Sequence, residues 1–244
     1  MSTITLQKLQ PDEISQAMLA QAAELFSSAY GIWGPLAEEK MGKFFKRGRR
    51  VKMSAERLRQ QSLAPGTRSV FVRALSNGKL VGHAFATRWD CQGQQMCWVT
   101  QLCVDPEFRS QGLATKILRE LRIGEKDQGF GILSSHPHAI LAALRAFGGG
   151  IEGFDMDMMK LHARGILDAS PFEYVKSCKL KGSLFGQEVT DGSVCSGDTS
   201  FWVDHDEPLA ALDQVKAKGG SWPFGDLLEG CEFIAIDSCL YPEL

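Results

Sequence analysis

Apolar residues recur in the first part of the chain with periods that predict one strand and two helices. Residues 4–9 alternate apolar and polar positions, as a half-buried strand does. From residue 14 to residue 29 the apolar positions lie three and four apart, which predicts one face of a helix that opens near Pro11. Ser54 is a candidate N-cap for a second helix that ends near Ser62.

Three strands are expected next, joined by short turns. Residues 69–74 are rich in β-branched and aromatic side chains, and the Asn77-Gly78 pair that follows is typical of a tight hairpin. Further strands are predicted at 80–89 and 96–104, with a polar turn at 90–95. Because residues 96–104 are almost continuously apolar, that strand is expected to be central and covered on both faces.

Beyond Pro106 the pattern changes to alternating helices and strands. Helices are predicted at 112–123 and 136–147, with a short strand at 130–134 between them. An antiparallel meander followed by such alternation indicates an α+β fold with a mixed central sheet flanked by helices. After Gly150 the weaker patterns favour strands at 154–161, 200–204 and 231–236, a helix at 208–218 and a polar loop at 187–199.

Charge is distributed unevenly along the 244 residues. Residues 1–149 hold 20 Lys and Arg against 12 Asp and Glu, whereas residues 150–244 hold 7 against 17. With the three glycines at 148–150, this shift suggests a boundary. We therefore expect a first domain at residues 1–161 and a C-terminal α/β extension at residues 162–244, packed on the first domain.

Composition narrows the class of protein. The hydrophobic share of 44% and the charged share of 23% are ordinary for a globular protein and exclude wholesale disorder. No run of 18 apolar residues and no secretory leader pattern occur, so we expect a cytoplasmic protein without a membrane partner. The seven cysteines include no C-x-x-C pair, which predicts reduced, buried thiols and no metal site.

The segment from Val99 to Leu118 carries the most specific chemistry. After a buried strand and a short loop, the residues from Arg109 to Ala114 open a helix. The first N–H groups of a helix lack intrahelical partners, and the helix dipole adds positive charge there, so anions bind at such ends. Gly112 has no Cβ to hold a phosphate away, and Thr115 can add a hydroxyl donor. The sequence lacks GxxxxGK[ST] and GxGxxG, which excludes a Walker A loop and a Rossmann fingerprint.

This segment resembles motif A of the GNAT family of acyl-CoA N-acyltransferases, whose pattern is [Arg/Gln]-x-x-Gly-x-[Gly/Ala]. Arg109, Gly112 and Ala114 occupy the three specified places. The predicted order of elements from residue 4 to residue 161 is also similar to that of the family. The resemblance implies the GNAT fold over residues 1–161, and the chain as a whole looks like a fungal member.

The resemblance also implies how acetyl-CoA binds as co-substrate. In GNAT proteins the pyrophosphate lies on the motif A amides, and the pantetheine arm pairs with the end of the fourth strand, which splays from the fifth. The amine enters from the opposite side and attacks the thioester directly, and a strand amide stabilises the oxyanion. The residues implied for CoA binding are Leu102, Cys103, Val104, Arg109, Ser110, Gln111, Gly112, Leu113, Ala114, Thr115 and Ser134.

The sequence departs from the family where proton transfer is expected. Many members carry a carboxylate on the fourth strand and a tyrosine in the last helix, but here the strand has Thr100 and Gln101, and residues 136–147 include no tyrosine. We expect the amine to lose its proton through water held by Thr100, Gln101 or His83, and His138 is a further candidate. For His83 the alternative is a structural core histidine, and for His138 a histidine at a helix end.

Two functions follow from the resemblance. The first is an acetyl-CoA-dependent N-acetyltransferase that acts on a small-molecule amine, as a monomer or homodimer. The second, suggested by the missing carboxylate and tyrosine, is a catalytically degenerate GNAT-fold CoA-binding or sensor module.

The basic stretch at residues 40–52 contains two phenylalanines and has three interpretations. It could be a solvated loop, a nucleic-acid or nuclear-import segment, or a wall of the acceptor cleft that favours an acidic acceptor. We expect the last of these, and hence no nucleic-acid partner.

Overall fold

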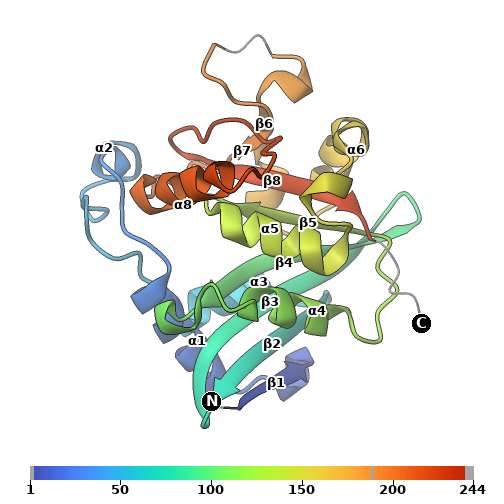
Figure 1. Ribbon diagram of the computed structural model, residues 1–244. Helices are drawn as coiled ribbons and strands as arrows, with labels where there is room; N and C mark the ends of the chain where they lie inside the picture. Colours follow the sequence, from blue (N-terminus) through green and yellow to red (C-terminus); the bar gives the residue numbers. More distant parts are fainter. Residues whose placement is uncertain (1–2, 188–189, 240–244) are drawn as a thin grey trace.

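The computed structural model describes residues 3–187 and 190–239. These residues contain one mixed sheet of eight strands, with helices packed against it (Figure 1). The strand order is β1-β2-β3-β4-β5-β8-β7-β6. All neighbouring strands are antiparallel except β4 and β5, which are parallel. The strands are β1 (Ile4–Leu9), β2 (Arg68–Ser76), β3 (Lys79–Cys91), β4 (Gln94–Val104), β5 (Gly129–Ser134), β6 (Lys179–Lys181), β7 (Ser196–Asp198) and β8 (Cys231–Ser238).

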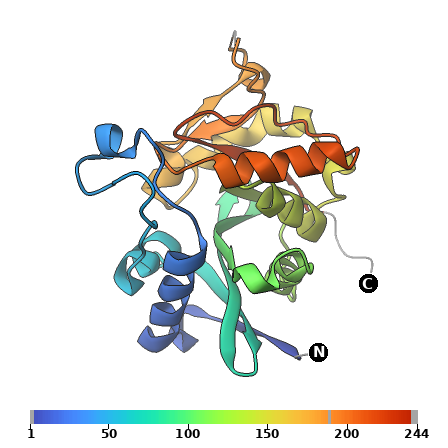
Figure 2. The ribbon, with the colours of Figure 1, turned by 60° about the vertical axis from the view of Figure 1, so that its left-hand side comes forward.

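Helices cover both faces of this sheet (Figure 2). Successive strand residues point to opposite faces, so Phe71 of β2 packs with α1 and α3, whereas Val72 packs with α4. Helix α5 lies beside α4 on the second face, and α8 contacts α5. The helices are α1 (Gln16–Ala29), α2 (Ala37–Met41), α3 (Ala55–Ser62), α4 (Leu113–Arg122), α5 (Pro137–Phe147), α6 (Met156–Asp168), α7 (Glu173–Lys176) and α8 (Asp206–Ala217), with short 3-10 turns at Pro11–Glu13, Pro106–Phe108, Ile151–Gly153 and Ser183–Phe185.

In the first 150 residues, the structure confirms several helices and turns that were predicted from local sequence signals. The Ser54 hydroxyl accepts a hydrogen bond from the Arg57 amide at 3.1 Å and so caps α3. Asn77 and Gly78 both have positive φ, which joins β2 and β3 in a tight hairpin. Helices α4 and α5 begin within one residue of the predicted positions.

Three expectations for the C-terminal part are wrong. Residues 154–161 are not a strand: α6 occupies Met156–Asp168, capped by Asp155 and buried through residues three or four apart, such as Met159 and Ala163. Residues 200–204 form a loop in which Val203 makes one bridge to Trp33. The expected loop at 187–199 contains β7, although residues 188 and 189 lie outside the described part of the chain.

Residues beyond 161 extend the same sheet that the N-terminal residues begin. Strand β8 pairs with β5 along its whole length, from Gly129 opposite Ser238 to Ser134 opposite Phe233. The division of the chain at residue 161 stays a prediction, and β6, β7 and β8 continue the sheet across it. In the described residues, no helix has the length and apolar character needed to cross a bilayer.

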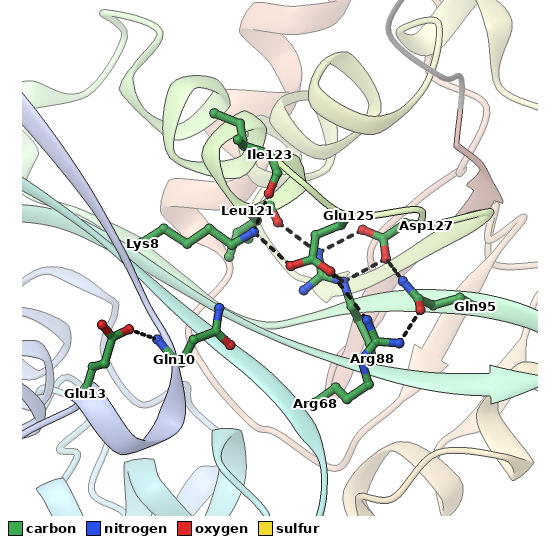
Figure 3. A network of polar contacts seen from close by, with 10 residues as sticks. All are labelled: Lys8, Gln10, Glu13, Arg68, Arg88, Gln95, Leu121, Ile123, Glu125 and Asp127. Atoms are coloured by element: carbon green, nitrogen blue, oxygen red, sulfur yellow. Dashed lines mark hydrogen bonds and ion pairs between the residues drawn. The ribbon is translucent and has the colours of Figure 1, made fainter.

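A network of charged side chains fixes one end of the β4–β5 pair (Figure 3). The guanidinium of Arg88, on β3, is buried and donates two hydrogen bonds to Asp127, at 2.7 and 2.8 Å. The amide of Gln95, on β4, donates to Asp127 at 2.8 Å, and Lys8 of β1 pairs with Glu125 at 2.8 Å. The loop that enters β5 is thereby tied to three other strands, so β4 and β5 stay together at this end.

Candidate active site

Strands β4 and β5 separate at the end opposite this network. They pair from Met96 opposite Gly129 to Val99 opposite Ile132, and no further. At this point β4 carries a bulge, because Phe85 of β3 lies opposite Gln101 while Ala86 lies opposite Val99. Thr100 is thus the extra residue, and a bulge bends and twists its strand. The bulge directs the end of β4 away from β5.

A cavity of about 1110 Å³ opens at this split. Its walls come from the ends of β4 and β5, the first turns of α4 and α5, the end of α1 and one side of α8. Most residues implied for CoA binding line it, as does the candidate His138. The lining residues among those predicted are Leu102, Cys103, Val104, Arg109, Ser110, Gly112, Leu113, Ala114, Thr115, Ser134 and His138. Gln111 is the exception, since its side-chain amide turns back to donate to the Glu107 carbonyl at 2.9 Å.

The N-terminus of α4 presents backbone amides to this cavity. Ser110 and Gly112 have φ of 59° and 76°, so the chain enters the helix through two left-handed residues. The Lys116 amide donates to the Gly112 carbonyl. The amides of residues 113–115 come before this bond in the chain, so they have no partner carbonyl within the helix. A Cβ added to Gly112 would meet no atom within 4 Å, so it would project into open space. These features make the turn a suitable anion-binding site.

Arg109 makes contacts that connect three elements around the cavity. Its guanidinium donates to the Val104 carbonyl at 3.2 Å and to the Ala29 carbonyl at 2.5 Å. It also forms a 2.6 Å ion pair with Glu207, at the start of α8. His136, the N-cap of α5, lies 3.9 Å from the same carboxylate. Helix α8 is thus held over the cavity by the arginine of motif A.

The predicted proton-transfer residues lie in two separate places. His83 and Gln101 are joined by a 2.8 Å hydrogen bond on the α1 face of the sheet, and the His83 ring lies against Phe71 and Phe85. Burial lowers the pKa of His83 to about 4, so its imidazole is neutral at physiological pH. His138 lies instead on the α5 side of the cavity, where burial and then Lys218 and Arg145 lower its pKa.

The hydroxyl of Thr100 is buried and has no hydrogen-bond partner within the described part of the chain. In the same described residues, no group of three His, Cys, Asp or Glu side chains is arranged to hold a metal ion.

Residues 33–138 match the sequence model of the acetyltransferase (GNAT) family. This part of the chain belongs to the GNAT family. The match includes the split, the bulge and motif A, and it confirms the fold and the acetyltransferase class predicted from Arg109, Gly112 and Ala114. The fungal origin stays a prediction.

Several solved GNAT structures are similar to the chain at low identity. YhbS of Escherichia coli, in complex with CoA, is 17% identical, with 66% of this chain and 73% of that chain covered and a TM-score of 0.39. The ribosomal-protein-S18-alanine N-acetyltransferase of Escherichia coli is 16% identical, with 57% and 74% covered and a TM-score of 0.37. An aminoglycoside acetyltransferase from an uncultured soil metagenomic sample is 17% identical, with 54% and 80% covered and a TM-score of 0.36. No curated protein matches the chain.

Sequence reasoning missed a cluster of ionisable groups beside the split of this GNAT domain. Glu232, on β8, is 9% exposed, and burial raises its pKa to about 7, although the Thr199 hydroxyl and the Ser135 amide lower it in part. Burial and then Glu232 also raise the pKa of Tyr30 and of Tyr174. The one signal in the sequence was a glutamate inside the otherwise apolar run at 231–236.

Proposed function

We propose that the chain is an acetyl-CoA-dependent N-acetyltransferase that transfers an acetyl group to the amine of a small-molecule acceptor by direct attack. The observation that carries the proposal is the split between β4 and β5, which opens into a cavity with the motif A amides at its edge. A GNAT domain with both features has the parts needed to hold an acyl-CoA.

The two ends of the cavity suit the two ends of the cofactor. The amides of residues 113–115 and the hydroxyl of Thr115 would hold the pyrophosphate. The edge of β4 at residues 102–104 no longer pairs with β5, so its free backbone groups can pair with the pantetheine amides. A backbone N–H at this edge can also stabilise the oxyanion that forms when the amine attacks.

The basic stretch supports an acceptor that carries negative charge. Arg50 lines the cavity and is joined to Ile32 by a β-bridge, which places residues 40–52 beside the end of α1. Phe45 packs edge-on against Trp33 with ring centres 5.0 Å apart, whereas Phe44 is 80% exposed. An exposed arginine at the mouth would attract a carboxylate or phosphate on the acceptor.

The test uses the purified full chain, acetyl-CoA and a panel of amines with and without an acidic group. We expect calorimetry to show binding of acetyl-CoA, and a thiol reagent to detect free CoA only when an amine is present. Binding without thiol release from any amine would support the CoA-binding or sensor module instead. Absence of both binding and a thermal shift would refute both functions.

A further inference from the structure

Glu232 lies on the acceptor side of the sheet, next to the split. Phe130 of β5 stacks on Phe147 of α5, so alternate residues of β5, including Ser134, face α5. Phe233 pairs with Ser134 and therefore faces α5 as well. Glu232, the next residue, points to the opposite face, which α1 covers at β2 and β3 and which α6 covers at β8. The ionisable groups nearest to Glu232 on this side include Cys178, which lies over the paired Gly197, and Tyr174 of α7.

The residues of β4 that face the same side lie across the split from Glu232. Cys103 belongs to the core cluster beneath α1, and Gln101, two residues earlier, shares its face. The end of β5 lies between β4 and β8, and neighbouring strands are about 4.8 Å apart. Glu232 is thus at least two strand spacings from β4, on the far side of the split and level with the residue that follows the end of β5.

Tyr30 lies at the cavity wall, and its pKa responds to Glu232. This residue ends α1 and lines the cavity. Its pKa is raised first by burial, then by Glu232 and then by Cys103. Ser135, whose amide interacts with the Glu232 carboxylate, also lines the cavity. The carboxylate therefore adjoins the cavity wall that Tyr30 and Ser135 form.

The Glu232 carboxylate is buried without a cationic partner. Among residues 3–187 and 190–239, no lysine, arginine or histidine forms an ion pair with it. An ionised carboxylate in this position is costly, and groups with strongly perturbed pKa values cluster at functional sites. A carboxyl group with a pKa of about 7 can accept a proton and release it again near neutral pH.

Other ionisable groups near the split suit proton transfer less well. The imidazole of His83 has a pKa near 4 and is fully buried between aromatic rings. Burial raises the pKa of the Cys103 thiol to about 12, so the thiolate is scarce at neutral pH. The carboxylate of Glu207 is paired with Arg109.

We infer that Glu232 is the general base that takes a proton from the ammonium group of the acceptor. The inference rests on the proposed N-acetyltransferase function and supplies the carboxylate that β4 lacks. The ammonium gives one proton to Glu232, and the freed nitrogen lone pair forms a bond to the thioester carbon. The carbon–sulfur bond then breaks, the second proton of the nitrogen ends on the CoA sulfur as the thiol, and Glu232 releases its proton to water.

The test compares the full-length wild type with Glu232→Gln and Glu232→Asp, using acetyl-CoA and an amine that the wild type acetylates. We expect Glu232→Gln to lower kcat by roughly 100-fold to 10,000-fold at pH 7 and to abolish the rise of kcat with pH around neutrality. Glu232→Asp keeps a carboxylate and should recover part of the rate. Calorimetry should give the same Kd for acetyl-CoA in all three proteins.

Glu229→Gln is the matched control, because Glu229 is an exposed glutamate three residues earlier. It should retain the wild-type kcat and pH profile. If folded Glu232→Gln binds acetyl-CoA and keeps the wild-type kcat and pH profile, the assignment is wrong while the proposed function stands. If the wild type binds acetyl-CoA but acetylates no amine, the proposed function fails and the assignment with it.

Discussion

Replacement of Gly112 tests whether the first turn of α4 binds the pyrophosphate. An Asp at this position would place a carboxylate beside the amides of residues 113–115, in space that is open in the free protein. A carboxylate and a phosphate about 5 Å apart repel by about 3 kcal/mol at an effective dielectric constant of about 20. Solvent screening offsets part of this repulsion, while the second charge of the pyrophosphate adds to it. A net cost of about 3 kcal/mol corresponds to a Kd for acetyl-CoA that is raised roughly 100-fold.

Two further variants separate charge from size and from backbone strain. Gly112→Asn has nearly the shape of the Asp variant without its charge, so it should raise the Kd by less than about tenfold. Gly124→Asp is the matched control, because Gly124 has the same φ of 76° and open space around its Cα, but lies beyond the far end of α4. It should lose similar stability, about 1–2 kcal/mol for the left-handed conformation, and keep the wild-type Kd.

Calorimetric titration with acetyl-CoA measures the Kd, and thermal melts confirm that each variant is folded. A Gly112→Asp protein that is folded and binds within threefold of wild type would refute the placement of the pyrophosphate at this turn. Equal losses in the Asn and Asp variants would show that shape, and not charge, decides the affinity.

Three other predictions follow from the charged residues. Asp127→Ala should destabilise the fold by about 3–5 kcal/mol in denaturant unfolding, because Arg88 would stay buried without its partner, whereas an unchanged midpoint would show that the network contributes little. Since burial raises the pKa of Glu232 from 4.5 to about 7, the folded state binds more protons than the unfolded state between these values. The free energy of unfolding should then fall by about 3 kcal/mol as pH rises from 4.5 to 7. Glu232→Gln should remove this decrease, which denaturant unfolding curves recorded at several pH values would show. Arg50→Gln should raise the KM for an acidic acceptor about fivefold without changing the Kd for acetyl-CoA. The control Arg47→Gln should leave both the KM and the Kd unchanged. Steady-state kinetics measure the KM, and calorimetry measures the Kd.

The sequence predicts those elements that short-range chemistry decides. A capping serine, an Asn-Gly turn and a glycine at the start of a helix act within four residues, so Ser54, Asn77 and Gly112 lie where their patterns indicate. The helix at Met156–Asp168 was mistaken for a strand because eight residues rich in methionine fit either period. Only the longer run, with buried residues at 159, 163, 166 and 167, distinguishes the helix.

The contacts that complete the site depend on the order of strands, which no local pattern fixes. Arg109 meets Glu207 because α8 lies between β7 and β8 in the chain and returns over the cavity. Glu232 comes beside the split because β8 enters the sheet between β5 and β7. Both arrangements bring together residues about 100 positions or more apart in the chain. From the sequence, Glu207 and Glu232 could be recognised only as part of an acidic C-terminal third.

The acidic C-terminal third therefore bears directly on the chemistry of the basic N-terminal part. Motif A and the split are proposed to hold an acyl-CoA, but β4 contains no carboxylate and offers only Thr100 and Gln101 near its end. A carboxylate on β8 reaches the same face from the other side of β5, and its burial there moves its pKa toward neutrality. In the proposed reaction, an amine bound between Arg50 and Glu232 would meet a positive charge at the cavity mouth and a proton acceptor at the sheet. That arrangement favours acceptors in which an acidic group and an amine lie at opposite ends of one small molecule.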